Sequence, residues 1–592
     1  MIQSRFPRLI GWFRFQATPS LPDEAIPAPR WVDAVLLLAL AAVGYGVMRA
    51  AAEWRAPLAA GMRIDLSAAR LPYYAGLSTL RMAIAYVISL AFSLVYARVA
   101  ATSRNAERVM LPLLDILQSI PILSFMPGVV LGLAALFPGR TLGLELAAII
   151  LIFTSQAWNL AFSFHQSLIT IPRELNEAAS VYRLGAWRRF TKLELPFGAI
   201  PLIANSMMSW AGGWFFLMAS EQFTLGDKNL RLPGLGSYLA GAAENGDTRA
   251  LILGLATLIT VIVLLEQLMW RPLVAWSDRF KFEQTGSAEA PTSRVLDALA
   301  GSAAVRWIDT RLVRPMLRGL DRLLSPIGRA SRGRTSPAER RYRWAVSVLT
   351  LLAGAGLLAL VLWGAWSAAR IVAALSLAEW RYVLLSAGAT FLRTSIALLI
   401  AAAWTVPVGV AIGMNPRLAR RLQPVVQIAA SVPATAVFPV LLLALLALPG
   451  GLNMAAVALM LLGTQWYVLF NVIAGAMAIP SDLREAAITY HVTGWRRWKT
   501  LILPAVFPYL VTGMITATGG AWNASIVSEY VTFAGRKVST VGLGALIAQA
   551  ADSGRFSLLL AGTLVMSAIV IAGNRLIWRR LYTLAESRFR LE

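Results

Sequence analysis

Long apolar runs alternate with short basic segments along the whole chain. Several runs reach about 20 residues, the length of an α-helix that crosses a bilayer. Backbone groups in lipid must be hydrogen-bonded within their own segment, so these runs should be helices. The pattern predicts an all-α polytopic membrane protein with about twelve transmembrane helices. Six fall in the first half, at 33–50, 79–98, 109–136, 143–166, 198–220 and 249–269. Six fall in the second, at 344–366, 386–413, 423–447, 453–476, 504–528 and 557–577.

The segments between the spans hold most of the Lys and Arg residues. Short loops rich in Lys and Arg are typical of the cytoplasmic side of a membrane. We therefore expect the N-terminus, the C-terminus and the segment 271–343 to be cytoplasmic. The first 30 residues lack the short apolar core and cleavage site of a signal peptide, so we expect no cleaved leader.

The second half of the chain repeats the first. Arg81 matches Arg393, and Pro121 matches Pro433, in both cases 312 positions later. From Trp158 onward the separation is 308, and it holds for pairs of Pro, Glu, Trp and Gly residues over some 90 positions. Two halves with the same orientation imply a pseudo-twofold axis along the membrane normal and a path between them. We predict a first domain at 1–270, a cytoplasmic linker at 271–343 and a second domain at 344–592.

The linker contains a segment with two chemically different faces. It holds 15 basic and 7 acidic residues. In "RLVRPMLRGLDRLLSPI" (311–327), the apolar residues Leu312, Met316, Leu320 and Leu323 fall on one helical face and arginines on the others. This pattern favours an amphipathic helix at the membrane surface. A solvent-exposed surface helix is the alternative.

A basic segment with central alanines appears once in each half. The first copy is "NEAASVYRLGAWRRFTKLELP" (176–196) and the second is "REAAITYHVTGWRRWKTLILP" (484–504). Alanine and glutamate favour a helix, which Pro172 is suited to start. Small residues on an exposed face would let a partner approach the backbone, and tryptophan and arginine are frequent at interfaces. The segment predicts a docking site for a cytoplasmic partner, with a loop that only sets topology as the alternative.

These two segments resemble the EAA loop of bacterial ABC importer permeases. That family usually has glycine six residues after the glutamate, where this chain has Arg183 and His491; glycines follow at Gly185 and Gly494. "TVPVGVAIG" (405–413), a Trp followed by Ser-Glu, and "GLG" before the last span are similar to the nitrate, sulfonate and taurine group of permeases. The resemblance covers roughly 75–275 and 385–590.

The resemblance implies the type I importer fold, with two permease domains fused in one chain. It implies two copies of a cytoplasmic ABC ATPase, an external solute-binding protein and a place in the bacterial inner membrane. The implied cargo is a small anion of the nitrate, sulfonate, taurine or bicarbonate kind. The coupling residues that it implies are Glu177, Ala178, Ala179, Gly185, Trp187, Arg188, Glu485, Ala486, Ala487, Gly494, Trp495 and Arg496.

Several other functions are not supported by the sequence. The chain has no cysteine and two histidines, so we expect no metal centre. The net charge of +24 lies in loops, which argues for a lipid bilayer and against nucleic acid as the partner. No G-x-x-x-x-G-K-[ST] segment occurs, so we expect no cofactor or enzyme activity in this chain, with ATP and Mg bound by the partner ATPase. The alternatives are a secondary transporter of the major facilitator type, an intramembrane enzyme, or a permease that works in export.

Each half places one arginine and one glutamate at a similar depth near the external face. These are Arg81 with Glu221, and Arg393 with Glu529. Charged groups at such a depth pair with one another or face water. We expect two ion pairs that hold an external gate on the translocation path, near Trp214 and Trp522. The alternatives are snorkelling to the interface, or arginines that attract an anionic substrate.

Overall fold

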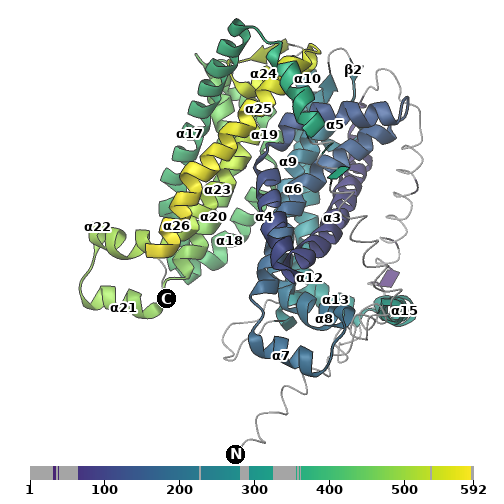
Figure 1. The fold of residues 1–592 in the computed structure, drawn as a ribbon, viewed down its shortest axis with the longest axis vertical. Coiled ribbons are helices and arrows are strands. Elements are labelled where there is room, and N and C mark those ends of the chain that lie inside the picture. Colours follow the sequence, from purple (N-terminus) through teal and green to yellow (C-terminus); the bar gives the residue numbers. More distant parts are fainter. Residues whose placement is uncertain are drawn as a thin grey trace, which may run out of the picture.

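The computed structural model describes residues 64–225, 228–280, 293–324, 362–533 and 536–588, with single residues between 31 and 48 and between 355 and 359. Its long helices form two groups that lie side by side (Figure 1). The first half is drawn in purple and blue, and the second half in green and yellow. We call the end that carries α7 (Arg173–Val181) and α21 (Ser481–Thr489) the lower end, and the opposite end the upper end.

The same series of helices is built twice. In the first half it is α3 (Leu71–Thr102), α4 (Arg104–Ser119), α5 (Ile122–Leu136), α6 (Leu142–Ile169), α9 (Leu195–Glu221), α10 (Leu235–Glu244) and α11 (Thr248–Leu265). In the second half it is α17 (Leu377–Met414), α18 (Pro416–Ser431), α19 (Ala434–Leu445), α20 (Gly451–Met477), α23 (Leu503–Ser528), α24 (Leu543–Asp552) and α25 (Phe556–Gly573). In both halves the fourth helix packs between the first and the fifth. The fold is therefore all-α and internally duplicated, as predicted.

Seven of the described helices are long and apolar enough to cross a membrane, or up to nine if each of two bent pairs counts as one span. The predicted span 33–50 lies outside the described residues, apart from a few single positions. The predicted span 344–366 is described at three positions before 361 and continuously from 362, where it is helical. The predicted span 198–220 forms α9, which is not one of the seven. α9 packs against α3, α6 and α10 of its own half and against α18 and α19 of the other.

Two predicted spans, 109–136 and 423–447, were wrong as single helices. α4 and α5 meet at 92°, and α18 and α19 meet at 82°. The break falls at Ile120-Pro121 in one half and at Val432-Pro433 in the other, where the backbone is extended. Proline disfavours the helical conformation of the residue before it and so ends the first helix there. The repeated "SIP" and "SVP" sequences therefore mark a bend.

Two glycines fix the register between the halves. A Cβ atom at Gly143 would lie 2.6 Å from the carbonyl oxygen of Leu133, and one at Gly451 would lie 2.0 Å from that of Leu445. Both glycines stand at the start of a long helix that passes close to the end of the preceding one. The separation has thus changed from 312 to 308 by Gly143, earlier than Trp158. It follows that Glu145 on α6 is equivalent to Asn453 on α20.

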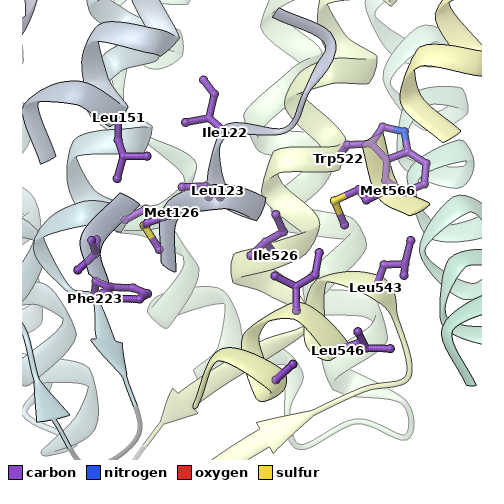
Figure 2. Packing of buried hydrophobic residues seen from close by; sticks show 14 of the residues in the cluster. Ile122, Leu123, Met126, Leu151, Phe223, Trp522, Ile526, Leu543, Leu546 and Met566 are labelled. Atoms are coloured by element: carbon purple, nitrogen blue, oxygen red, sulfur yellow. The ribbon is translucent and has the colours of Figure 1, made fainter. Parts of the chain in front are cut away.

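The two halves meet around the bent helices. α5 packs against α23 and α24 of the second half, and α19 packs against α9 and α10 of the first half. Figure 2 shows the apolar cluster at this contact, with Ile122, Leu123 and Met126 on one side and Trp522 and Ile526 on the other. The Leu123 backbone N–H also donates to the Asn523 side-chain oxygen at 3.2 Å.

Short hairpins and helices occupy the upper end (Figure 1). β1 (Thr224–Leu225) pairs with β2 (Lys228–Asn229), and β3 (Tyr530–Phe533) pairs with β4 (Arg536–Ser539), both antiparallel. α10 and α24 follow these hairpins. Lys537 of the second hairpin pairs with Asp552, and this hydrogen bond raises the pKa of Lys537 above its ordinary value.

Candidate functional site

The two EAA segments lie at the lower end, where each starts with a short helix. The first consists of α7 and α8 (Ala186–Arg189), and the second of α21 and α22 (Gly494–Arg497). Each continues through a π-helical turn, Phe190–Glu194 or Trp498–Ile502, into the next long helix. Glu177 and Glu485 are exposed, and Ala178 and Ala486 are half-buried. The same arrangement of helices, with an exposed glutamate, is thus presented twice at one end of the molecule.

The second alanine of each motif is not on the exposed face. Ala179 is 3% exposed and packs in a cluster with Leu175 and Leu193, and Ala487 is 8% exposed. The expectation of a face of small residues open to a partner was therefore wrong for these two alanines. A small side chain at this place lets the helix pack closely against the segment that follows it.

The turn after each helix keeps the backbone conformation that glycine favours. Arg183 has φ 48° and His491 has φ 52°, both in the left-handed region. The Leu184 N–H bonds to the Ala179 carbonyl at 3.0 Å, and the Val492 N–H bonds to the Ala487 carbonyl at 2.8 Å. These bonds close the helix ends in the manner of a Schellman motif. Arg183 and His491 therefore adopt the left-handed conformation that a glycine at this place would adopt without strain.

The tryptophan and arginine clusters differ between the two segments. Trp187 is half-buried with its ring 5.9 Å from that of Phe190, whereas Trp495 is 73% exposed. Arg188 and Arg496 are both exposed. Gly185 is extended, while Gly494 has φ 55°. Both segments expose an aliphatic residue and a tyrosine near the turn: Val181 (79%) and Tyr182 (56%) in the first, and Ile488 (66%) and Tyr490 (80%) in the second.

An ion network attaches the first EAA segment to the lower end of α3. The Arg98 Nε lies 3.0 Å from a carboxylate oxygen of Glu194, and the other oxygen is 3.2 Å from the Arg189 Nε. Arg98 also donates to the Ala186 carbonyl, and its guanidinium lies over the Phe190 ring at 4.8 Å. These contacts join α3, α8 and the start of α9. We call this network the brace.

In the second half, apolar side chains make the equivalent contact between α17 and the start of α23. The residues equivalent to Arg98 and Glu194 are Val410 and Ile502, each 4% exposed and part of one hydrophobic cluster. The two EAA segments are therefore held by different chemistry. Sequence reasoning missed the brace, because Glu194 contacts a residue nearly a hundred positions away.

The predicted pair Arg81–Glu221 is present and is more elaborate than expected. The Arg81 guanidinium contacts Glu221 at 2.7 Å and also binds Glu145 through two nitrogens, at 2.5 and 2.7 Å. Arg81 is 1% exposed, so it does not snorkel to the surface. Glu221 accepts further hydrogen bonds from the Ser78 hydroxyl and the Gly236 N–H, both at 2.7 Å. We call this set the first latch.

The second latch keeps the same plan with fewer charges. Arg393 contacts Glu529 at 2.7 Å and donates to the Asn453 side-chain oxygen at 3.1 Å. Glu529 accepts from the Thr390 hydroxyl at 2.8 Å and from the Gly544 N–H at 2.9 Å. Because Glu529 accepts a backbone N–H group, an arginine at this position could not replace it. The first latch thus has two carboxylates for one arginine, whereas the second has one of each.

The latches explain the "GLG" sequences. A Cβ atom at Gly234 would lie 2.3 Å from the Glu221 carboxylate, and one at Gly542 would lie 2.1 Å from that of Glu529. The glutamates are fixed by their arginines and cannot move away. The first glycine of each motif is therefore required by close approach. Glu145 was missed by sequence reasoning, although an isolated acid near the start of an apolar run is a usable signal.

Each latch lies within one half and does not bridge the two. The first connects α3, α6, α9 and the start of α10, and the second connects the equivalent parts of the second half. Trp214 and Trp522 are buried at 1% and 3%, and neither is among the residues that line the cavities described below. The gating role of these six residues stays a prediction.

Cavities follow the contact between the halves. A central cavity of about 90 Å³ is formed by α9, the α18–α19 bend, α20 and α23. Every lining residue that the structure describes is uncharged. Small and aliphatic residues are joined there by five aromatic and two amide side chains: Phe215, Phe216, Gln427, Trp466, Tyr467, Phe470 and Asn523. A cavity of about 250 Å³ nearer the lower end shares Gln427 with it and is lined by Glu266, Arg271 and Arg420.

A third cavity, of about 190 Å³, lies near the upper end. Its walls include Leu123 and Ile526 of the apolar cluster in Figure 2, and the polar residues Arg231, Tyr530 and Asp552. The apolar cluster borders this upper cavity, and Asn523, which caps Leu123, also lines the central one. Among the described residues, no group of His, Asp or Glu has the arrangement of a metal site.

Comparison with known proteins agrees with this duplicated arrangement. The profile of the family described as "Binding-protein-dependent transport system inner membrane component" matches residues 89–269 and again 405–591. These two matches contain both EAA segments, the brace residue Glu194 and both glutamates of the GLG contacts. Members of this family are transport proteins rather than enzymes.

Individual relatives are permeases named for nitrate, bicarbonate and taurine transport. The chain is 26% identical over 189 residues to the nitrate import permease protein NrtB of Leptolyngbya laminosa, covering 32% of this chain and 64% of that protein. It is 27% identical to the bicarbonate transport system permease protein CmpB of Synechococcus elongatus, over 32% of this chain and 65% of the relative. For the taurine transport system permease protein TauC of Escherichia coli the identity is 25%, over 33% and 68%.

The alignment with NrtB spans slightly less than two thirds of that relative's length. The family profile, by contrast, matches more than half of this chain, once in each structural half. The chain therefore belongs to the family of binding-protein-dependent transport system inner membrane components.

Proposed function

We propose that this chain forms the whole membrane pathway of an ATP-driven importer for a small solute. Both permease halves that a path requires are present in one polypeptide. The observation that carries the proposal is the pair of EAA segments, which share helix length, an exposed glutamate and the left-handed turn at one end of the molecule. Two docking surfaces with the same helix-and-turn arrangement fit two copies of an ATPase subunit.

In this proposal the lower end is cytoplasmic and the upper end faces a solute-binding protein. ATP binding would bring the two ATPase subunits together and move both EAA segments. That motion would separate the apolar contact of Ile122, Leu123, Trp522 and Ile526 and open the central cavity toward the upper end. ATP hydrolysis would let the contact reform, and solute would leave through the lower cavity.

The cavities support a small solute as cargo. A central space of about 90 Å³ is well below the 300–1,000 Å³ of usual drug-sized ligand sites. Amides, a phenol and aromatic edges offer hydrogen-bond donors and partial positive charge without a fixed cation. Arg271 and Arg420 place positive charge in the lower cavity. Together with the nitrate, bicarbonate and taurine relatives, this favours a small anion.

The proposal is tested by transport in proteoliposomes that contain the chain, its ATPase and its binding protein. Nitrate, bicarbonate and taurine are offered in turn, and substrate-stimulated ATP turnover is measured. Glu177→Lys with Glu485→Lys should abolish the stimulation, whereas Arg370→Lys, at an exposed residue that belongs to neither segment, should not. Unchanged stimulation in the double variant would overturn the coupling role. Uptake driven by a proton gradient without the ATPase would overturn the ATP-driven mechanism.

A further inference from the structure

Part of the linker forms a continuous helix at the lower end. α14 (Ala303–Ile308), a π-helical turn (Asp309–Val313) and α15 (Arg314–Leu324) follow one another without a break. The start of this helix is fixed, because the Ser302 hydroxyl accepts from the Val305 N–H at 3.2 Å. The Asp33 carboxylate accepts from the Ala304 N–H at 3.1 Å. We call residues 303–324 the linker helix.

The linker helix is held beside the end of a transmembrane span. α13 (Arg294–Gly301) precedes it and packs against α12 (Arg271–Ser277), which continues the direction of α11. Farther along, α15 contacts α8 of the first EAA segment. Figure 1 shows α13, α8 and α15 close together at the lower end. The linker helix therefore lies at the level where the apolar spans end.

One face of the linker helix exposes large apolar side chains. Trp307, Leu312 and Met316 are 59%, 57% and 68% exposed. A π-helical turn contains about one residue more than an α-helical turn, so Trp307 and Leu312, which are five residues apart, lie on the same face. Met316 follows Leu312 by four residues and lies on that face one α-helical turn later. The side chains of Leu320 and Leu323, predicted on the same face, lie outside the described residues. A row of exposed apolar side chains of this kind marks a surface that contacts a membrane or another protein.

The opposite face carries positive charge. Arg318 and Arg322 are exposed, with Arg318 about half a turn away from Met316. The exposed Arg311 flanks the apolar face, about a quarter turn from Leu312. Arg314 pairs with Asp309 at 2.8 Å. A polar face rich in arginine, with tryptophan, leucine and methionine on the other face, is typical of helices that lie in the membrane interface. Long arginine side chains reach around such a helix to lipid headgroups.

We propose that the linker helix binds the surface of the membrane, with its apolar face in the boundary between headgroups and acyl chains and its arginines on anionic phospholipid headgroups. Charge complementarity and the position at the end of α11 and α12 both favour lipid over a protein partner. Since α15 contacts α8, the bound helix would also hold the first EAA segment near the bilayer. The proposal concerns this chain and its lipid alone, so it does not depend on ATP, solute or the transport mechanism.

The chain has no cysteine, so a single introduced cysteine gives a unique labelling site. We would attach a nitroxide at Met316→Cys, and separately at Arg318→Cys as the matched control on the other face. The full chain is placed in nanodiscs of phosphatidylcholine with or without phosphatidylglycerol. Electron paramagnetic resonance then compares collision with oxygen, which enters lipid, and with a polar nickel complex, which stays in water. A label at Leu312→Cys repeats the test on the apolar face.

In discs that contain phosphatidylglycerol, the ratio of oxygen to nickel collisions should be several-fold higher at positions 312 and 316 than at 318. Without the anionic lipid this contrast should fall. Equal, water-like values at all three sites in both discs would overturn the proposal. Protection of positions 312 and 316 that appears only after the ATPase is added would also overturn it, and would assign the face to that protein.

Discussion

Glu145 on α6 and Asn453 on α20 occupy equivalent places, and each contacts the arginine of its own half. Glu145 gives Arg81 a second carboxylate, whereas Asn453 gives Arg393 a neutral oxygen. The N-terminus of α6 stands beside the extra negative charge of Glu145 and favours it, and the N-terminus of α10 does the same for Glu221. The second latch shows that the architecture holds with a single carboxylate.

Replacing Glu145 with asparagine should therefore be tolerated. Arg81 keeps Glu221, so we expect a loss of about 1–2 kcal/mol in the free energy of unfolding. Replacing Glu221 with alanine leaves Arg81 paired with Glu145 but removes the acceptor of a third guanidinium nitrogen, of the Ser78 hydroxyl and of the Gly236 N–H. Three buried donors left without acceptors should cost about 3–5 kcal/mol. Thermal unfolding of the purified chain in detergent measures both. A larger loss for Glu145→Asn than for Glu221→Ala would contradict this account of the latch.

A methyl group at the first glycine of either GLG motif should disturb its latch. Gly234→Ala and Gly542→Ala place a Cβ atom within 2.3 and 2.1 Å of a fixed carboxylate, so we expect a loss of about 1–3 kcal/mol. Gly241→Ala is the control, since its Cβ atom would meet its nearest neighbour at an ordinary 3.5 Å. The readout is again the melting temperature. A loss at Gly241 equal to that at Gly234 would rule out the steric explanation.

The positive φ angles of Arg183 and His491 predict how substitutions at these two positions change stability. Arg183→Gly and His491→Gly remove a strain of about 1–2 kcal/mol and restore some freedom to the unfolded chain, so each should be neutral or stabilising by up to about 1 kcal/mol. His491→Val should destabilise the turn because a branched side chain resists positive φ. Limited proteolysis of the second EAA segment reports the difference. Faster cleavage of the glycine variant than of the valine variant would show that the turn is not left-handed.

The brace residues of the first half can be replaced by the apolar residues at the equivalent positions of the second half. Arg98→Val alone leaves Glu194 without its partner on α3, whereas Arg98→Val with Glu194→Ile reproduces the apolar joint of Val410 and Ile502. We expect the single variant to lower substrate-stimulated ATP turnover several-fold and the double variant to recover part of it. Turnover at the wild-type level in the single variant would show that the brace has no part in coupling.

The sequence was sufficient to predict the features that follow from the internal repeat and from the depth of charged residues in the membrane. The pair Arg81–Glu221 followed from two charged residues at one depth, and the duplicated halves followed from matched Trp, Pro and Glu residues. The bend at Pro121 was missed because an apolar run was read as one helix, although the residue before a proline signals a break. Asn453 and Val410 could not be interpreted until the structure showed which arginine and glutamate they replace.

The central claim is that one chain supplies both halves of the pathway and two docking sites for an ATPase. Native mass spectrometry of the tagged chain, purified with the ATPase that accompanies it, tests this claim most directly. We predict one copy of the chain with two ATPase subunits, one ATPase subunit after Glu177→Lys or Glu485→Lys alone, and none after both. Two copies of the chain for two ATPase subunits, or ATPase retained by the double variant, would contradict the account.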